Sequence, residues 1–368
     1  MGAADLPLSG LTVIAIEQAV AAPYATVRLA DAGARVIKVE RPEGDFARGY
    51  DSVASGQSSY FVWLNRGKES VVLDLAKDSG KNELAHLLSH ADILVQNLKP
   101  GALAKLGFDK QALAEKFPKL ISVSISGYGE NGPNAKRKAY DLLIQADSGL
   151  CSITGGPDGP ARVGISIVDI ATGATTYSAI LEALINRGRT GKGAHISVSM
   201  FDVMAEWLTV PLLNHEGGHT PQRVGLSHPS IAPYGVFTCK DGKRVLISIQ
   251  SDREWAKFAE IFLGQPGLAS DPRFATNVAR VASRTDTDAV VAKGFAIRTA
   301  EQAIEAIAKA DVAFASVNDM EGLSQHPHLR RISVETPNGT IQYPAPAVIF
   351  EGEARSYGKV PALPDPAS

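Results

Sequence analysis

The chain has 368 residues, of which 45% are hydrophobic and 21% are charged. This composition is typical of a folded globular protein, and the length suits one large and one smaller domain. The formal net charge is −2, so no surplus of basic residues favours nucleic acid or a membrane surface as a partner. No uncharged apolar run reaches the roughly 18 residues that a membrane-spanning helix needs.

The two cysteines, Cys151 and Cys239, are too few for a disulfide framework. We therefore expect reduced thiols and a cytoplasmic protein. Either thiol could in principle be a nucleophile, but a small buried thiol is the more common case. The first residues lack the basic and apolar regions of a secretory signal peptide, which also favours the cytoplasm.

Strand-like and helix-like segments alternate through the first half of the chain. Short apolar runs predict strands over residues 11–16, 35–40, 70–75, 93–96, 120–125 and 195–199. Periodic segments between them predict helices, among them 79–89 and 110–116. Strand, helix, strand units of this kind predict an α/β fold with a doubly wound, Rossmann-like parallel sheet.

Turns rich in small or polar residues follow four of these strands, at residues 17–22, 41–44, 97–101 and 127–132. Because open parallel sheets bind their ligands at the carboxyl ends of the strands, we expect a ligand at this edge. The Gly-x-Gly-x-x-Gly pattern of dinucleotide-binding proteins is absent after the first strand. Its absence argues against a nicotinamide-dependent dehydrogenase.

The second half of the chain has a different texture. A hairpin around the turn at 241–242 and helices near 252–262, 287–295 and 300–309 predict a small α+β domain. The division that we expect is a large domain over 1–205, a linker over 206–224, a small domain over 225–315, and a return segment over 316–368 that completes the large domain.

A possible metal motif lies after a helix predicted over residues 200–214. His215-Glu-Gly-Gly-His219 fits the His-Glu-x-x-His pattern of zinc peptidases, which requires both histidines on one helix. Two adjacent glycines and the nearby Pro221 disfavour that helix. We therefore expect a polar loop and no metal site.

Asp169 stands where a long helical segment begins, since apolar residues recur at helical spacing from Ile170 to Ile185. One interpretation is an N-cap, whose carboxylate accepts a hydrogen bond from the first turn. The other is chemical. The electropositive helix N-terminus would keep the carboxylate ionised, and an ionised carboxylate can act as a covalent nucleophile. The residues alone leave both interpretations open.

Several blocks in a fixed order resemble the class III coenzyme A transferases, the carnitine and formyl-CoA transferase (CaiB/BaiF-like) family. These blocks are Ala22-Pro23, Val36-Ile-Lys-Val-Glu-Arg41, Leu64-Asn-Arg-Gly-Lys68, Asn97-Leu-Lys-Pro-Gly101, the segment around Asp169, and Asp271-Pro-Arg-Phe274. The resemblance implies an enzyme that moves coenzyme A from an acyl-CoA donor to a carboxylic acid. It further implies a coenzyme A thioester as the substrate, no tightly bound cofactor, and an interlocked homodimer.

The same resemblance implies roles for individual residues. Asp169 matches the nucleophile, which forms an aspartyl anhydride and then an aspartyl-CoA thioester. Nine further positions match the family's contacts with coenzyme A, namely Ala19, Val20, Ala21, Arg41, Leu73, Asn97, Leu98, Lys105 and Lys138. For the cations in this set, the alternative is an ordinary solvated surface charge.

Two departures from the family pattern bear on the substrate and the tail. The glycine run of formyl-CoA transferases is replaced here by residues 248–255, so formate or oxalate exchange is not favoured. The usual Gly-x-His-Thr ending is replaced by residues 361–368.

Arg48 and His228 lie in loops that could face the acyl pocket. A cation there would suit acids with a second carboxylate, such as succinate, itaconate, mesaconate or citramalate, although a solvated surface position is as reasonable.

Two rival functions are open at this stage. The α-methylacyl-CoA racemases carry a catalytic histidine at the position of Tyr140, and tyrosine, with an ordinary pKa of about 10, is a poor base. This substitution favours transfer, with Tyr140 as a substrate contact, although His195 or His228 could supply another base. The second rival is a coenzyme A-binding protein without activity.

Overall fold

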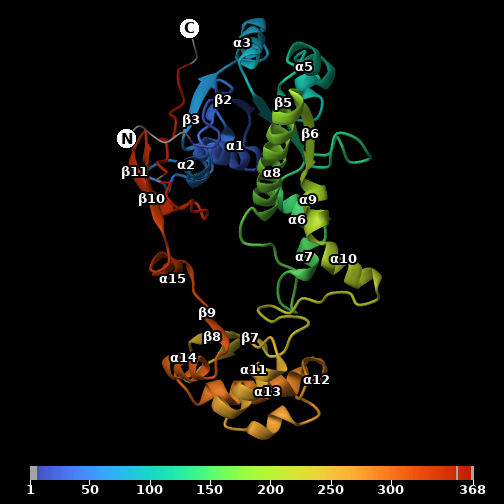
Figure 1. Cartoon of the computed structure of the whole chain (residues 1–368), viewed down its shortest axis with the longest axis vertical. Coiled ribbons are helices and arrows are strands. Elements are labelled where there is room, and N and C mark those ends of the chain that lie inside the picture. The colour runs from blue at the N-terminus through green and yellow to red at the C-terminus, as the bar shows by residue number, and fades with distance from the viewer. Residues whose placement is uncertain (1–5, 354, 366–368) are drawn as a thin grey trace. The chain divides into compact units, whose positions relative to one another are not determined.

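The computed structural model describes residues 6–353 and 355–365. Two compact units make up the chain. Unit 1 comprises Met1–Cys151, Arg162–Leu213 and Arg330–Ser368, and unit 2 comprises Ser152–Ala161 and Asn214–Leu329. Unit 1 is therefore assembled from segments on both sides of unit 2 in the sequence (Figure 1).

In the described part of unit 1, six parallel strands form one sheet in the order β3-β2-β1-β4-β5-β6. The predicted parallel sheet is therefore confirmed. The strands are β1 (Thr12–Ile16), β2 (Arg35–Glu40), β3 (Lys68–Val72), β4 (Ile93–Gln96), β5 (Ile121–Ser126) and β6 (Ala194–Ser199). The strand predicted over 70–75 lies two to three residues too far towards the C-terminus, since β3 begins at Lys68, which pairs with Val36 of β2. The error arose because the first residues of β3 are polar.

Helices cover both faces of this sheet. Alternate residues of β1 point to opposite sides, so Val13 and Ala15 belong to one core and Ile14 and Ile16 to the other. The first core is completed by α1 (Ala21–Asp31) and α8 (Ile167–Thr190), and α8 runs alongside β5 and β6 (Figure 1). The second is completed by α3 (Asp78–Ser89), α4 (Ala102–Lys105) and α5 (Lys110–Lys116).

Shorter elements complete unit 1. They are η1 (Phe46–Gly49), α2 (Ser59–Asn65), α6 (Asp141–Asp147), α9 (Met200–Trp207) and the C-terminal hairpin of β10 (Arg331–Thr336) and β11 (Gly339–Pro344). The boundary between the two units in the sequence falls within α7 (Leu150–Ile153). The hairpin packs on α2 through a small apolar core that contains Phe61, Val62 and Val334. The C-terminal segment thus contributes to the folding of unit 1.

Unit 2 has a separate core. In the described residues its sheet has three antiparallel strands, β7 (Tyr234–Thr238), β8 (Arg244–Ser248) and β9 (Ala313–Ser316). Around this sheet lie α11 (Asp252–Ile261), η2 (Pro266–Ala269), α12 (Asn277–Ala282), α13 (Arg284–Ala296) and α14 (Ala300–Lys309), followed by α15 (Met320–Ser324). Their shared core is aromatic, with Trp255, Phe258, Phe262 and Phe295 fully or almost fully buried.

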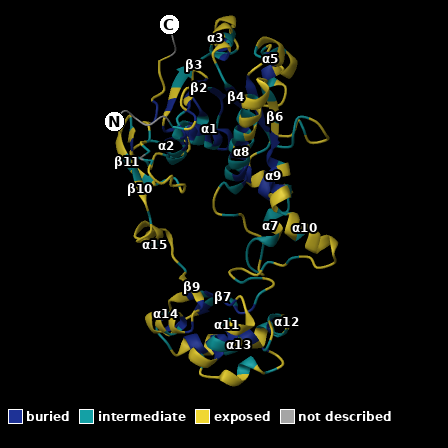
Figure 2. Cartoon of the chain, viewed as in Figure 1, coloured by how far each residue is buried: buried dark blue, intermediate teal, exposed yellow. Residues whose placement is uncertain are grey.

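The helix predicted over 200–214 is broken into α9 and α10 (Thr209–Glu216), with Leu208 between them. Because α10 ends at Glu216, His215 and His219 do not share a helix. Figure 2 shows α10 as largely exposed. Across residues 6–353 and 355–365, no helix combines the length and the apolar character that crossing a membrane would require.

Candidate active site

A cavity of about 580 Å³ opens at the carboxyl ends of β1 and β4. These neighbouring strands flank the point where the strand order of the sheet reverses, which is where doubly wound sheets bind their ligands. The loop after β1, the loop after β4, the segment leading into α6 and the first turn of α8 contribute to its walls. Asp169 lies in the wall that α8 contributes.

Asp169 is the third residue of α8, and Ser166 occupies the N-cap position. The interpretation of Asp169 as the N-cap is therefore wrong. The carboxylate that caps this helix comes from Asp141, whose Oδ2 accepts hydrogen bonds from the N–H groups of Val168 and Asp169 at 2.8 and 3.1 Å. Within the described residues, no hydrogen bond or ion pair reaches the side-chain carboxylate of Asp169, which leaves its oxygens available for chemistry.

The Asp169 carboxyl titrates far from its ordinary range. Burial raises its pKa to about 7, and the negative charge of the adjacent Asp141 contributes to the rise. The sequence-based expectation was that the helix N-terminus would keep this carboxylate ionised. The shift runs against that expectation, because burial opposes the charged form and because Asp141, not Asp169, accepts the hydrogen bonds of the Val168 and Asp169 N–H groups.

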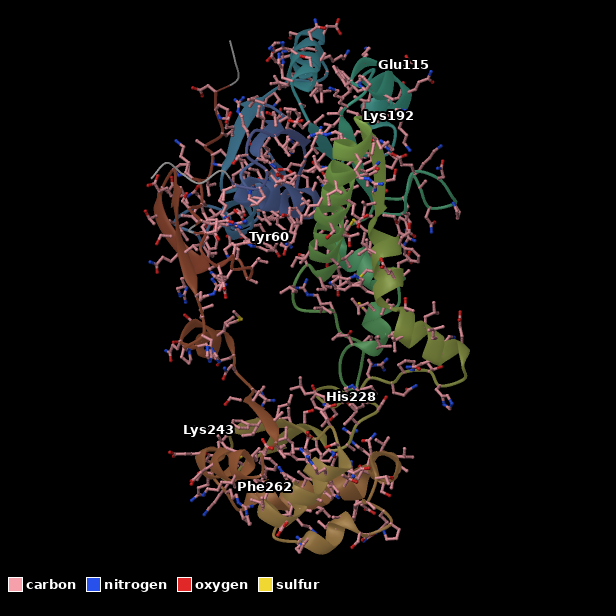
Figure 3. The ribbon with its side chains drawn as sticks, in the orientation of Figure 1. Tyr60, Glu115, Lys192, His228, Lys243 and Phe262 are labelled. Carbon is pink, nitrogen blue, oxygen red and sulfur yellow. The ribbon has the colours of Figure 1, made fainter. Side chains whose placement is uncertain are left out.

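Tyrosine hydroxyls gather around the same cavity, from Tyr50, Tyr60 and Tyr140. The rings of Tyr50 and Tyr60 meet edge to face, 5.5 Å apart between centroids, and Tyr60 lies on α2 (Figure 3). Burial raises the pKa of Tyr50 to about 12, with the charges of nearby acids contributing. Its hydroxyl therefore keeps its proton at neutral pH and can donate a hydrogen bond to a negatively charged oxygen.

The loop after β1 is held from two sides. Asn97 Oδ1 accepts a hydrogen bond from the Gln18 N–H at 3.0 Å, and Asn97 Nδ2 donates to the Gln18 carbonyl at 2.8 Å. Ala19 adopts a left-handed backbone with φ of 62°, which is unusual for a residue other than glycine. Its N–H donates to Asp45 Oδ1 at 3.2 Å, and Asp45 Oδ2 in turn binds the buried Lys38 ammonium at 2.8 Å.

This support predicts the effect of Asp45→Ala. The variant leaves the Lys38 ammonium without one carboxylate partner in a site where its side chain is fully buried, and removes the acceptor for Ala19. Breaking a buried pair from one side costs about 3–5 kcal/mol, so we expect a markedly lower thermal midpoint. Glu43→Ala, in the same loop but 74% exposed, is the matched control. Equal midpoints for the two variants would contradict this account.

A smaller cavity of about 260 Å³ lies beside the first, and both are lined by Gln18 and Leu98. Arg41 and Leu73 belong to the smaller cavity. The guanidinium of Arg41 donates to the Gly44 carbonyl at 2.9 Å and is otherwise largely exposed. Both cavities thus lie at the carboxyl-terminal edge of the sheet.

Comparison with known proteins identifies the family. The model of CoA-transferase family III matches residues 8–365. The chain belongs to CoA-transferase family III. It is therefore a CoA-transferase, and enzymes of this kind use coenzyme A thioesters as substrates.

Curated relatives of this CoA-transferase support the assignment across most of the chain. It is 37% identical to an acetyl-CoA:oxalate CoA-transferase of Acetobacter aceti, over 94% of this chain and 90% of the relative. It is 36% identical to a succinate–glutarate CoA-transferase of Agrobacterium fabrum, over 91% and 87%. A crystal structure of a CaiB/BaiF family protein from Brucella suis is 35% identical, covers 96% of each chain, and superposes with a TM-score of 0.81.

The structure brings most of the sequence-predicted residues of the CoA-transferase together. The larger cavity is lined by Asp169 and by Ala19, Val20, Ala21, Asn97, Leu98, Lys138 and Tyr140. The smaller cavity is lined by Arg41, Leu73 and Leu98. Leu98 lines both cavities.

Three predicted residues lie elsewhere. Lys105 is exposed at the end of α4 and lines neither cavity. The Arg48 guanidinium is paired with Glu40, with Nη2 to Oε1 at 2.6 Å, and lies over the Phe61 ring. His228 belongs to unit 2, in the loop before β7 (Figure 3). Its ring stacks on that of Tyr234.

Asp141 is the main residue that sequence reasoning missed. It follows Tyr140 directly, but its contacts reach 27 and 28 residues along the chain to the start of α8. The local sequence around Asp141 carries no sign of this contact. An acidic residue at the start of a short helix predicts only a favourable interaction with its own helix dipole.

Proposed function

We propose that this CoA-transferase moves coenzyme A between small dicarboxylic acids, with Asp169 as its covalent nucleophile. The observation that carries the proposal is the Asp169 carboxylate, which faces the cavity and, in the described residues, has no protein partner. Cations that could neutralise a second carboxylate line the same cavity, namely Lys99, Arg137, Lys138 and Arg162. The relatives named above take dicarboxylates, as their names state.

The reaction proceeds by acyl exchange at Asp169. An Asp169 oxygen attacks the thioester carbon of the donor, the C–S bond breaks, and coenzyme A leaves as the thiolate, which gives a mixed anhydride. The thiolate then attacks the aspartyl carbon, releasing the donor acid and forming an aspartyl-CoA thioester. The acceptor carboxylate attacks the carbon of that thioester, the C–S bond breaks, and coenzyme A leaves again as the thiolate, which gives a second anhydride. The thiolate attacks the acceptor carbon of this anhydride, which regenerates Asp169.

The cavity walls suit the charges that develop in these steps. Each attack places negative charge on a carbonyl oxygen, and the cavity is lined by Tyr50, Tyr60, Tyr140 and Gln18, whose side chains can donate hydrogen bonds. We propose that the adenosine and phosphates of coenzyme A lie in the smaller cavity beside Arg41, and that pantetheine passes Gln18 and Leu98 to reach Asp169. No tightly bound cofactor is required.

The second carboxylate needs a cation that is free to bind it. Arg48, suggested by the sequence, would first have to release Glu40. Arg162 lines the cavity with Asp169, and its described hydrogen bond goes to the Gly164 carbonyl and not to an acid. We therefore propose Arg162 as the primary contact for this carboxylate, and Arg48 and His228 as residues to be tested beside it.

The test is a screen of purified protein by mass spectrometry. Succinyl-CoA and acetyl-CoA serve as donors, and glutarate, oxalate, mesaconate, itaconate and citramalate as acceptors, with butyrate as the matched monocarboxylate. We expect dicarboxylates to react faster than butyrate, and Arg162→Ala to reduce this preference more than Arg48→Ala does. Equal rates with butyrate would refute the dicarboxylate assignment.

Racemisation is less well supported by the site. Among the described residues that line the Asp169 cavity there is no histidine, and the racemase histidine position is Tyr140. His195 instead lines a different cavity, where it hydrogen-bonds to the Ser122 hydroxyl at 2.9 Å. The histidine base of the racemases is therefore absent among the described residues that line this cavity.

The pH dependence follows from the Asp169 carboxyl. Because its pKa in the unliganded protein is raised to about 7 and the attacking form is the carboxylate, kcat/KM should fall about tenfold per pH unit below pH 7. Above about pH 8 it should reach a plateau. Initial rates from pH 5 to 9 measure this. A flat profile down to pH 5 would contradict the requirement for an ionised Asp169 nucleophile with this pKa.

We also propose a homodimer. Exposed apolar side chains follow one another at the end of α9 and on α10, namely Trp207 (55%), Val210 (67%), Leu212 (50%) and Leu213 (61%). Such a patch is typical of a protein interface. An interlocked arrangement is what the family resemblance implies. A cytoplasmic location fits the two free cysteines in the described residues.

Light scattering tests the assembly. We expect a mass twice the 38.9 kDa of one chain, and a shift towards the single-chain mass in Trp207→Glu, because a buried charge would oppose association. Val278→Glu, at another highly exposed apolar position in α12, is the control for the added charge. A single-chain mass for the unmodified protein at micromolar concentration would contradict the dimer.

A further inference from the structure

Three N–H groups converge on the carboxylate of Asp141. Its Oδ2 accepts from Val168 and Asp169, and its Oδ1 accepts from Gln145 Nε2 at 2.6 Å. The Gln145 side chain cannot be reversed without loss, because its Oε1 accepts a hydrogen bond from the Val163 N–H at 2.9 Å. A group that faces three donors and offers none must be acceptor-only, which a carboxylate is and an amide is not.

We propose that Asp141 is a positioning residue for the transfer reaction, which takes the hydrogen bonds of the α8 N-terminus and thereby leaves the Asp169 carboxylate unstabilised and reactive. This inference rests on the proposed role of Asp169. A nucleophile that capped its own helix would have its negative charge spread over N–H donors and would attack more slowly. Asp141 occupies those donors, so the negative charge of Asp169 faces the cavity and the substrate.

The charge of Asp141 has a second effect on the same reaction. Two adjacent carboxylates repel each other, and acylation of Asp169 removes one of the two negative charges. The anhydride and the thioester on Asp169 are therefore favoured over the free carboxylate. The same repulsion favours protonation, in line with the direction in which the pKa of Asp169 moves.

Other charged and titratable residues line the same cavity as Asp169. They are the cations Lys99, Arg137, Lys138 and Arg162 and the tyrosines Tyr50, Tyr60 and Tyr140. The cations act in the opposite direction to Asp141, because a positive charge stabilises the carboxylate. Removing the negative charge of Asp141 should therefore lower the pKa of Asp169.

The experiment is an NMR titration of protein labelled with 13C at the aspartate carboxyl carbons. The Asp169 signal is identified by its loss in Asp169→Asn. We compare the unmodified chain with Asp141→Asn and with the double variant Asp141→Asn, Gln145→Glu. The double variant exchanges donor and acceptor between the two side chains, so the hydrogen bonds between them and to the Val163, Val168 and Asp169 N–H groups can be kept while the charge moves away from Asp169. Only the long hydrogen bond from Gln145 Nε2 to the Ile165 carbonyl, at 3.4 Å, is lost. Glu83→Gln, an exposed position on α3, is the control for loss of one charge.

We expect the midpoint of Asp169 to fall by about one pH unit or more in Asp141→Asn, and to fall less in the double variant. The acid limb of kcat/KM with succinyl-CoA and glutarate should move in parallel, and less aspartyl-CoA thioester should accumulate. An unchanged midpoint in both variants would overturn the role of Asp141. Unimpaired transfer by Asp169→Ala would instead overturn the nucleophile, whatever the titration shows.

Discussion

Replacing Asp169 by alanine or asparagine is expected to lower the rate of coenzyme A transfer by at least about a thousandfold. The neighbouring carboxylate in the cavity lining, Asp141, cannot take over because its oxygens accept hydrogen bonds from three N–H groups. Asn keeps the shape of the side chain but is a poor nucleophile. The rate is measured by following the appearance of acceptor acyl-CoA. Glu182→Gln, an exposed acid on the same helix, should retain the activity of the unmodified chain.

The same variants should be at least as stable as the unmodified chain. Since the pKa of Asp169 is raised in the folded state, ionising it opposes folding at every pH above its ordinary value. Asp169→Asn should therefore unfold at a higher temperature above pH 7, with the difference shrinking as the pH falls towards about 4. An inactive variant that is also less stable at pH 8 would indicate a structural role for Asp169.

Gly173→Ala is expected to disable the enzyme although alanine is the better helix former. A Cβ at Gly173 would lie 2.6 Å from the Ala21 carbonyl oxygen and 2.9 Å from Tyr24 Cβ, both in α1. Overpacking of this kind costs about 1–3 kcal/mol. It would also push α8 away from α1 one turn after Asp169, and a displacement of about 1 Å at a reacting group can reduce the rate about a hundredfold.

The matched control is Gly188→Ala in the same helix, where a Cβ would meet no atom within 4 Å. There the ordinary helix preference should dominate and raise stability by up to about 1 kcal/mol. Thermal melts and kcat of the two variants give the comparison. If both variants behaved alike, close packing of α1 against α8 would not be what holds Asp169 in place.

The sheet and the position of the ligand edge could be predicted because they depend on local patterns. Apolar runs predicted most of the strands. The start of β3 was not predicted because Lys68 is charged and can be buried only through its ion pair with Glu17, which is far away in the sequence. Asp169 was identified as the nucleophile by family resemblance. The capping of α8 by Asp141 could not be predicted from the sequence. That contact joins the first residues of two helices across a loop that partly belongs to unit 2.

Arg48 is a second residue whose surroundings could not be predicted from the local sequence. Its position in a loop suggested a free cation, whereas the structure pairs it with Glu40. A pairing over eight residues through a turn leaves no periodic signal in the sequence. Arg162, one of the cations that line the cavity, was not predicted as a site residue because it lies in a loop rich in glycine and proline.

The most direct measurement is mass spectrometry of the peptide that contains Asp169, after the protein has been mixed with succinyl-CoA and quenched with hydroxylamine. We expect a hydroxamate on the Asp169 side chain, since hydroxylamine cleaves an acyl anhydride or thioester but leaves a free carboxylate unchanged. A protein that transfers coenzyme A while this peptide keeps its unmodified mass at every time point would contradict covalent catalysis by Asp169.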